Sequence, residues 1–258
     1  MSVIRSLFSA FLMYTRIPVP QVEWREENRR YSLCFFPLCG VMIGAALILW
    51  RWLCFKLGIG DLLFATVCTA IPVMITGGIH IDGFCDVCDA IASCGSKEKM
   101  LQIMSDPHIG SFAVIRAGLY LLIQTGLFSQ IKSFNAMAVC SLCFIGSRAF
   151  SGLAAVTFRS AKNEGTLQQF VKPAHRNITI ACELIYIAAI VCAALSVDFF
   201  LGISALIGMA VSFVYYRIFS YKKFGGITGD LAGYFLQVCE LTGIICVVAS
   251  EIIMEAIV

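Results

Sequence analysis

The 258-residue chain is 59% hydrophobic and only 14% charged, with a mean hydropathy of +0.87. Soluble domains average roughly 45–50% apolar and 25% charged residues, so this composition excludes an ordinary soluble domain and indicates a polytopic membrane protein. The net charge of +3 is too small to indicate nucleic-acid binding. No internal repeat or flexible linker is apparent, so we treat residues 1–258 as one membrane-embedded catalytic domain.

The first apolar segment, residues 1–14, is followed by the sequence Thr-Arg-Ile-Pro-Val-Pro at 15–20. Crossing a bilayer needs about 20 apolar residues, and a segment of roughly 12–14 falls short. No small-residue cleavage site follows it, which argues against a removable signal peptide. We therefore expect an interfacial or re-entrant helix here instead of a true span.

Later apolar segments are long enough to be predicted as membrane spans. In chain order they are 33–55, 62–79, 109–130, 136–158, 178–197, 199–219 and 231–253. The predicted fold class is therefore all-α, a polytopic membrane bundle of about seven transmembrane spans. The segment 199–219 contains Ser204, Ser212 and Arg217, and if it did not cross, the carboxy-terminal side would be reversed.

Long polar connections between these spans alternate with short ones, so the long connections all fall on one side. They are 18–31, 80–108, 159–177 and 220–230. They hold most of the Lys and Arg residues, and by the positive-inside rule they face the cytoplasm. We expect a multi-pass protein of the cytoplasmic membrane with this face toward the cytoplasm.

An acidic cluster opens the second long connection, at 77–89. If this segment is helical, Asp82, Asp86 and Asp89 are spaced by four and then three residues and project within about 40° of one another. A hard divalent cation such as Mg²⁺ removes the repulsion among three carboxylates, and such a Mg²⁺ is the usual partner of substrate phosphates. We predict that these three residues bind the metal.

Glycines at Gly77, Gly78 and Gly83 would let a ligand approach the backbone closely. Two other interpretations of the acidic cluster stay open at this point. In the first, the acids are solvated groups on a cytoplasmic loop. In the second, they are part of an ion pathway through the membrane.

Thirteen cysteines also raise a metal or redox interpretation. Most lie in predicted spans, where a thiol behaves as a small apolar side chain. Cys85 and Cys88, with Cys94, His80 and His108, are the alternative zinc set, but a second well-spaced pair is missing.

A second glycine-rich segment, Phe-Gly-Gly-Ile-Thr-Gly-Asp at 224–230, precedes the last span. Asp230 here is either a helix cap or part of a site in which the glycine-rich turn donates backbone N–H groups to phosphate. Gln237 is seven residues on and faces the same way, with Glu240 about 60° further round. Both constellations lie on the predicted cytoplasmic side and would meet over one substrate.

Together these motifs resemble a known family. The pattern Gly-Gly-x-His-x-Asp-Gly-x-x-Asp-x-x-Asp at 77–89, with the segment 99–110 after it, is similar to the signature of cobalamin synthase, the adenosylcobinamide-GDP ribazoletransferase family. Further matches are 11–20, Ser147-Arg148, Glu164-Gly165 and 225–240. The resemblance covers nearly the whole chain, although Gln237 stands where many members carry glutamate.

The resemblance implies a membrane-bound, Mg²⁺-dependent enzyme of vitamin B12 biosynthesis. Such an enzyme joins adenosylcobinamide-GDP to α-ribazole or its 5′-phosphate, giving adenosylcobalamin or its 5′-phosphate and releasing GMP. Self-association, or association with other enzymes of cobalamin assembly, stays open.

This chemistry assigns roles to the candidate residues. Asp82, Asp86 and Asp89 would hold one or two Mg²⁺ ions at the diphosphate. Asp230 would complete the metal shell or orient the nucleophile, and His80 is either the general base or hydrogen-bonded to a neighbouring carboxylate. The expected catalytic residues are His80, Asp82 and Asp230. The expected substrate-binding residues are Gly77, Gly78, Gly83, Arg16, Arg148, Asp106, Gly226, Thr228, Gly229 and Glu240.

For Arg148, in a predicted span, the alternative is a structural ion pair without substrate contact.

Two other functions are alternatives to the transferase. A CDP-alcohol phosphotransferase expects Asp-x₂-Asp-Gly-x₂-Ala-Arg, and this chain has Asp82-Gly83 without the preceding aspartate or the Ala-Arg. A cation transporter would show Mg²⁺-dependent flux instead of GMP release.

Overall fold

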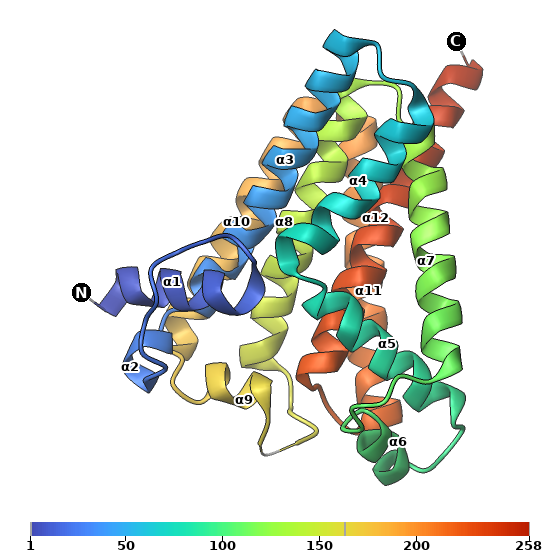
Figure 1. Cartoon of the computed structure of the whole chain (residues 1–258). Coiled ribbons are helices and arrows are strands. Elements are labelled where there is room, and N and C mark those ends of the chain that lie inside the picture. The colour runs from blue at the N-terminus through green and yellow to red at the C-terminus, as the bar shows by residue number, and fades with distance from the viewer. Residues whose placement is uncertain (1, 163, 258) are drawn as a thin grey trace.

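The structure, a computed structural model, describes residues 2–162 and 164–257 (Figure 1). These residues form helices, with a single isolated bridge between Ser160 and Ile227 as their only β-type pairing. In chain order the elements are α1 (Ser2–Tyr14), α2 (Glu26–Arg29), the 3-10 helix η1 (Leu33–Phe35), α3 (Phe36–Leu57), α4 (Asp61–Thr76), α5 (Ile79–Ala92), α6 (Lys97–Ile103), α7 (Ser111–Gln130), α8 (Phe134–Thr157), α9 (Thr166–Val171), α10 (Arg176–Val197), α11 (Phe199–Phe224) and α12 (Gly229–Ile257).

Within the described residues, six helices are long and apolar enough to cross a membrane, or seven if the bent pair of α4 and α5 is one span. This confirms the predicted all-α membrane bundle. The predicted span 62–79 corresponds to α4, which has only 16 residues. It rises about 24 Å, which is less than the roughly 30 Å of bilayer hydrocarbon. The chain then bends by 95° into α5.

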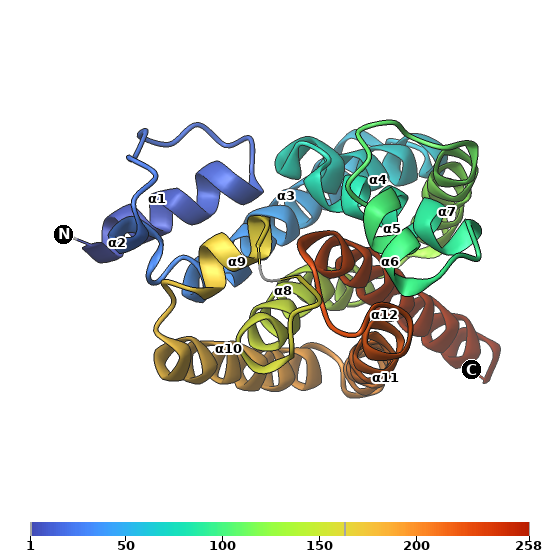
Figure 2. The ribbon, with the colours of Figure 1, turned by 90° about the horizontal axis from the view of Figure 1, so that it is seen from below.

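The central helix of the bundle is α8, whose apolar window is 78% buried. It packs against α3, α10, α11 and α12, and the view along the bundle shows it between α3 and α10 (Figure 2). Close approach to α3 depends on Gly40, where a Cβ would lie 2.4 Å from the Phe144 carbonyl oxygen. The outer helices α7 and α10 are only 22% buried and expose large apolar side chains such as Leu122 and Ile185. Those faces suit contact with lipid.

The amino-terminal helix α1 is short and lies across the bundle instead of along it (Figure 1). It packs on α2 and on the start of α3. This arrangement agrees with the expected interfacial or re-entrant helix.

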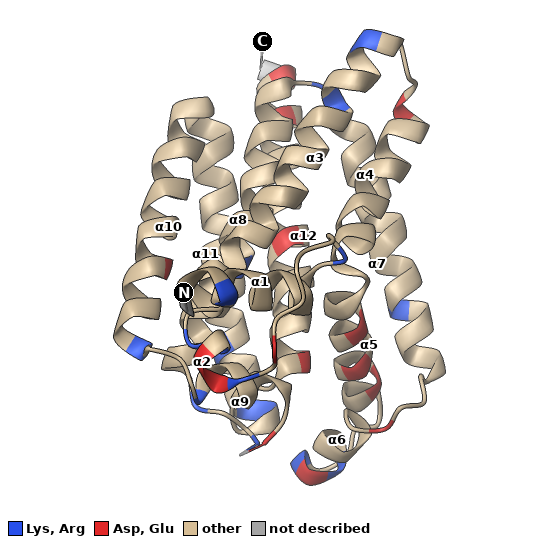
Figure 3. Cartoon of the chain, turned by 60° about the vertical axis from the view of Figure 1, so that its left-hand side comes forward, with Lys and Arg blue, Asp and Glu red and all other residues tan. Residues whose placement is uncertain are grey.

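Charged side chains gather toward one end of the bundle, around α2, α5, α6 and α9 (Figure 3). All thirteen cysteines are free thiols, and Cys85 and Cys88 are buried in the packing of α5. That the charged end faces the cytoplasm stays a prediction.

Candidate active site

The break between α4 and α5 is built by two consecutive glycines in left-handed conformation. Gly77 has φ +66° and Gly78 has φ +82°, values that side-chain-bearing residues rarely adopt. The Gly78 N–H donates to the Val73 carbonyl at 3.1 Å and closes the last turn of α4. A Cβ on Gly77 would also lie 2.3 Å from Arg16 Nε. The two predicted ligand-approach glycines therefore form the turn that aims α5 and seat the Arg16 side chain.

Helices α5 and α12 touch backbone to backbone. A Cβ on Gly83 would lie 2.9 Å from the Asp230 carbonyl oxygen, and one on Gly233 would lie 2.9 Å from the His80 carbonyl oxygen. The structure thus gives Gly83 a packing role against α12. This crossing brings the acidic face of α5 toward Asp230, so the two constellations expected to meet do meet.

Acidic side chains face one another across this crossing. Asp86 is half-buried and lies within electrostatic range of Asp82, Asp89 and Asp230. Asp82 also lies within electrostatic range of Asp230. The positively charged ammonium group of Lys162 lies within electrostatic range of both Asp86 and Asp230. Its Nζ donates to Ser105 Oγ at 2.8 Å, which fixes the ammonium group beside the acids.

Asp89 lies on the same face but is engaged with α7. Its Oδ2 accepts the Gly110 N–H at 2.6 Å, and its Oδ1 accepts the Ala113 N–H at 2.8 Å. Gly110 is the N-cap residue of α7 and has no side chain to cap it, so Asp89 satisfies the free N–H groups from a neighbouring helix. The structure gives Asp89 a capping role, and we replace it by Asp230 in the metal set proposed below.

No group of three or more His, Cys, Asp or Glu side chains within 2–162 and 164–257 is close enough to form a ready protein cage for a metal ion. Neither the alternative zinc set nor the predicted set of Asp82, Asp86 and Asp89 therefore forms a ready cage among the described residues.

Three adjoining cavities surround the acids. The outer cavity, about 530 Å³, lies between α1 and the turn at Gly77 and is bounded by Asp82. The central cavity, about 270 Å³, is lined by α1, α3, α5, α8, α9 and α12 and also reaches Asp82. The polar cavity, about 200 Å³, lies between the segment 160–168 and the start of α12. Asp82 borders the outer and central cavities and Asp230 borders the central and polar cavities, so acids lie at both junctions.

Arg16 lies where a phosphate-binding cation would be expected. Its backbone N–H donates to the Ile75 carbonyl at 2.7 Å, which ties the end of α1 to α4. Its exposed side chain lines the outer cavity together with Asp82.

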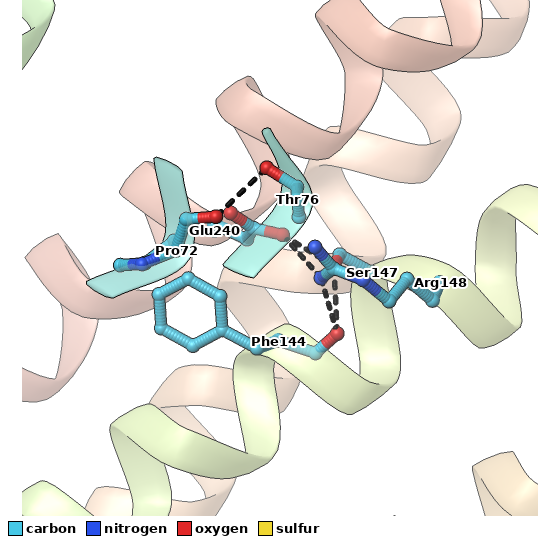
Figure 4. A network of polar contacts seen from close by, with 6 residues as sticks. All are labelled: Pro72, Thr76, Phe144, Ser147, Arg148 and Glu240. Atoms are coloured by element: carbon cyan, nitrogen blue, oxygen red, sulfur yellow. Dashed lines mark hydrogen bonds and ion pairs between the residues drawn. The ribbon is translucent and has the colours of Figure 1, made fainter. Parts of the chain in front are cut away.

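Arg148 and Glu240, two of the predicted substrate-binding residues, pair with each other in the interior of the bundle. Arg148 Nη1 lies 2.7 Å from Glu240 Oε1, and each side chain is only 1% exposed. Ser147 Oγ donates to the same carboxylate oxygen at 2.9 Å, and the Phe144 carbonyl accepts from Arg148 (Figure 4). An unpaired charge is too costly in this apolar interior, so the two residues pair with each other between α8 and α12. The ion pair weighed for Arg148 is observed, and the substrate-binding role of the two residues stays a prediction.

His80 is also buried, with only 5% of its surface exposed. Its ring lies 6.1 Å from the Tyr14 ring and 5.8 Å from the Phe36 ring, and all three residues line the central cavity. Nε2 has no hydrogen-bond partner within the described part of the chain. A hydrogen bond from this nitrogen to a neighbouring carboxylate, one of the two expectations, is therefore not formed.

Asp106 lies away from the cavities described here, on the loop between α6 and α7. The His108 backbone N–H and then its ring hydrogen-bond to the Asp106 carboxylate and lower its pKa. Both side chains are exposed, so the pair shapes the loop and Asp106 has no visible route to the acids.

In the second glycine-rich segment, 224–230, some residues have structural roles and others line the cavities. A Cβ on Gly226 would lie 2.4 Å from the Arg159 carbonyl oxygen, where the chain pairs with the strand-like segment at Ser160. Thr228 Oγ1 accepts the Leu231 N–H at 3.2 Å, so Thr228 is the cap of α12 and Asp230 is left to face the acids. Gly229 lines both the central and the polar cavity.

Lys162 and Glu164 also line the polar cavity, and neither is among the predicted site residues. In the sequence, Lys162 counts only among the cations of the long connection 159–177. The signal that could have found this segment was the Glu164-Gly165 match, which lies beside it in the sequence.

Comparison with known proteins agrees with the arrangement. The family model described as Cobalamin-5-phosphate synthase matches residues 6–248. An adenosylcobinamide-GDP ribazoletransferase of Lachnoclostridium phytofermentans is 42% identical over 96% of this chain and 95% of the relative. Proteins of the same name from Clostridium perfringens strain 13 (34% identical, 90% of this chain and 93% of the relative) and Listeria monocytogenes EGD-e (31%, 95% and 97%) are also similar. No solved structure matches.

Proposed function

Because this chain belongs to the cobalamin-5-phosphate synthase family, we propose that it is the transferase that joins adenosylcobinamide-GDP to α-ribazole or α-ribazole 5′-phosphate. The products would be adenosylcobalamin, or its 5′-phosphate, and GMP. The observation that carries this proposal is the meeting of Asp82 and Asp86 on α5 with Asp230 on α12. Asp82 and Asp230 lie at the junctions of the three cavities.

Mg²⁺ fits this set of donors. Mg²⁺ is usually bound through one or two carboxylates together with substrate phosphates and water, and dedicated protein cages are uncommon for it. The absence of a ready cage among the described residues agrees with that mode. Asp86 lies within electrostatic range of Asp82 and Asp230, and Lys162 lies beside Asp86 and Asp230. An added divalent cation would relieve the repulsion among the three carboxylates. When bound with the diphosphate, Mg²⁺ would neutralise charge that develops on the phosphoryl oxygens.

The reaction forms one bond and breaks one. The ribazole hydroxyl oxygen bonds to the corrinoid-side phosphorus, and the bond from that phosphorus to the bridging oxygen breaks. The bridging oxygen leaves with GMP, and the hydroxyl proton passes to a base at the site. His80 suits that role because it lines the central cavity, where the hydroxyl would approach, and its Nε2 has no hydrogen-bond partner within the described residues.

Cations of the chain would bind the phosphate oxygens that the metal leaves free. Lys162 lies beside Asp86 and Asp230, and Arg16 lies across Asp82 in the outer cavity. Charge-assisted hydrogen bonds of this kind orient the diphosphate and stabilise its developing charge. The largest and outermost cavity is left for the bulky corrinoid ring.

The test is direct turnover. The purified chain in lipid nanodiscs is supplied with adenosylcobinamide-GDP, α-ribazole and Mg²⁺, and cobalamin and GMP are separated by chromatography. Asp82→Asn, Asp86→Asn and Asp230→Asn should each lower kcat by at least about 100-fold, and EDTA should stop turnover until Mg²⁺ is restored.

Asp106→Asn is the matched control, since Asp106 is an acid on an exposed loop away from the cavities. It should retain near wild-type turnover. Absence of cobalamin and GMP, with Mg²⁺ flux in vesicles instead, would replace the transferase by a transporter.

A further inference from the structure

We propose that the polar cavity binds the guanine nucleotide half of the substrate and that Glu164 recognises the guanine base. This inference rests on the proposed function, which requires a site for the GMP that leaves. It adds a pocket and a specificity residue that the acidic junction alone does not supply.

The polar cavity has the side chains that guanine needs. Its lining includes Ser160, Lys162, Glu164 and Gln168, with the Asp230 end open to the acids. Guanine presents two adjacent N–H donors on its pairing edge, N1–H and the 2-amino group, and a carboxylate accepts both at once. Glu164 is exposed and forms no ion pair within the described residues, so its oxygens are free to accept.

The central cavity is more apolar on the side formed by α1, η1 and α3. Its walls there include Tyr14, Leu33 and Phe36, which suit a flat base with few hydrogen-bonding groups, such as that of α-ribazole. A guanine stacked against that apolar side would leave polar groups of its pairing edge without partners, which opposes binding there. The two cavities therefore distinguish the two bases by polarity.

The connection between these cavities suits the reaction. They share Gly229 and Asp230, so a nucleophile in the central cavity and a leaving nucleotide in the polar cavity approach the same acids from different sides. Phosphoryl transfer requires attacking and leaving oxygens roughly in line. Lys162, held by Ser105 beside Asp230, is placed to bind the phosphate of the departing nucleotide.

The experiment measures nucleotide binding apart from turnover. Dissociation constants for GMP and AMP are measured by calorimetry with the full chain in nanodiscs and Mg²⁺. AMP lacks both guanine donors, so the wild type should bind GMP at least about tenfold more tightly, within the range of one bidentate pair. Glu164→Ala should remove most of that preference, and Glu164→Gln should remove part of it. Gln168→Ala changes a second side chain that lines the polar cavity.

Two controls separate this pocket from its surroundings. Tyr14→Ala alters the central cavity and should raise the KM for α-ribazole while leaving the GMP dissociation constant unchanged. Glu98→Ala removes an exposed acid of α6 that lines none of the cavities described here and should change neither.

The outcomes distinguish the two levels of the proposal. An unchanged preference for GMP over AMP in Glu164→Ala, in an enzyme that forms cobalamin, overturns the guanine pocket alone. Glu164-dependent GMP binding without any cobalamin formation supports the pocket and rejects the proposed reaction.

Discussion

A Cβ atom on Gly83 would lie 2.9 Å from the Cα atom of Asp230, so these two residues hold α5 and α12 in backbone contact. The contact sets how far the acids of α5 lie from the acid of α12. Catalysis by metal and phosphate is sensitive to such distances, since a misplacement of about 1 Å can lower a rate by roughly 100-fold.

We therefore expect Gly83→Ala to separate the acids. The added methyl group should push α5 from α12, lower kcat by about 100-fold and lower stability by roughly 1–3 kcal/mol through overpacking. Turnover and thermal unfolding in nanodiscs measure the two effects. Gly118→Ala on α7 is the matched control, because nothing lies within 4 Å of a Cβ there. Full activity in Gly83→Ala would show that the crossing does not set the site.

Asp89 provides a test that separates capping from metal binding. Asp89→Ala removes both acceptors for the Gly110 and Ala113 N–H groups, and loss of a helix cap typically lowers stability by about 1 kcal/mol. We expect a lower thermal midpoint with an unchanged Mg²⁺ concentration for half-maximal activity. A raised Mg²⁺ requirement in this variant would return Asp89 to the metal set.

Replacing only one member of the buried pair Arg148 and Glu240 should lower stability more than replacing both. Arg148→Met leaves an unpaired carboxylate in an apolar interior, and breaking a buried pair lowers stability by roughly 3–5 kcal/mol. The double variant Arg148→Met/Glu240→Leu removes both charges, so we expect it to unfold at a higher temperature than either single variant. Additive losses in this cycle would contradict a direct pairing.

Much of the fold follows from local properties of the sequence. The apolar segments and the polar connections located the spanning helices, since lipid requires long apolar runs with internal hydrogen bonds. The spacing of Asp82 and Asp86 placed both on one face of α5, because that property depends only on helical periodicity. The recurrence of glycine before an acid indicated both halves of the site.

What the sequence did not predict depends on contacts between distant residues. Arg148 and Glu240 are 92 residues apart, and nothing in either segment shows that they pair. Asp89 has the same helical spacing as Asp82 and Asp86, but its carboxylate accepts hydrogen bonds from the start of α7. Only the packing of the two helices reveals this contact. Lys162 reaches the acids because Ser160 pairs with Ile227 beside the start of α12.

The orientation of the site in the membrane is testable with a cysteine that the chain already has. Cys94 is exposed, and it follows α5 at the charged end of the bundle. Cys192, also exposed, lies within α10, where lipid should shield it from hydrophilic reagents. If this end faces the cytoplasm, a membrane-impermeant maleimide should label Cys94 in inverted vesicles and leave it unlabelled in intact cells.

Cys94→Ser is the control and should abolish that labelling. Asp86 is in α5 with Lys162 beside it, and Cys94 directly follows α5, so the labelled side is also the side from which a charged nucleotide substrate would enter. Labelling of Cys94 from outside intact cells would mean that the site opens away from the cytoplasm. In that case the positive-inside interpretation of the long connections would be wrong, because their Lys and Arg residues would lie on the translocated side.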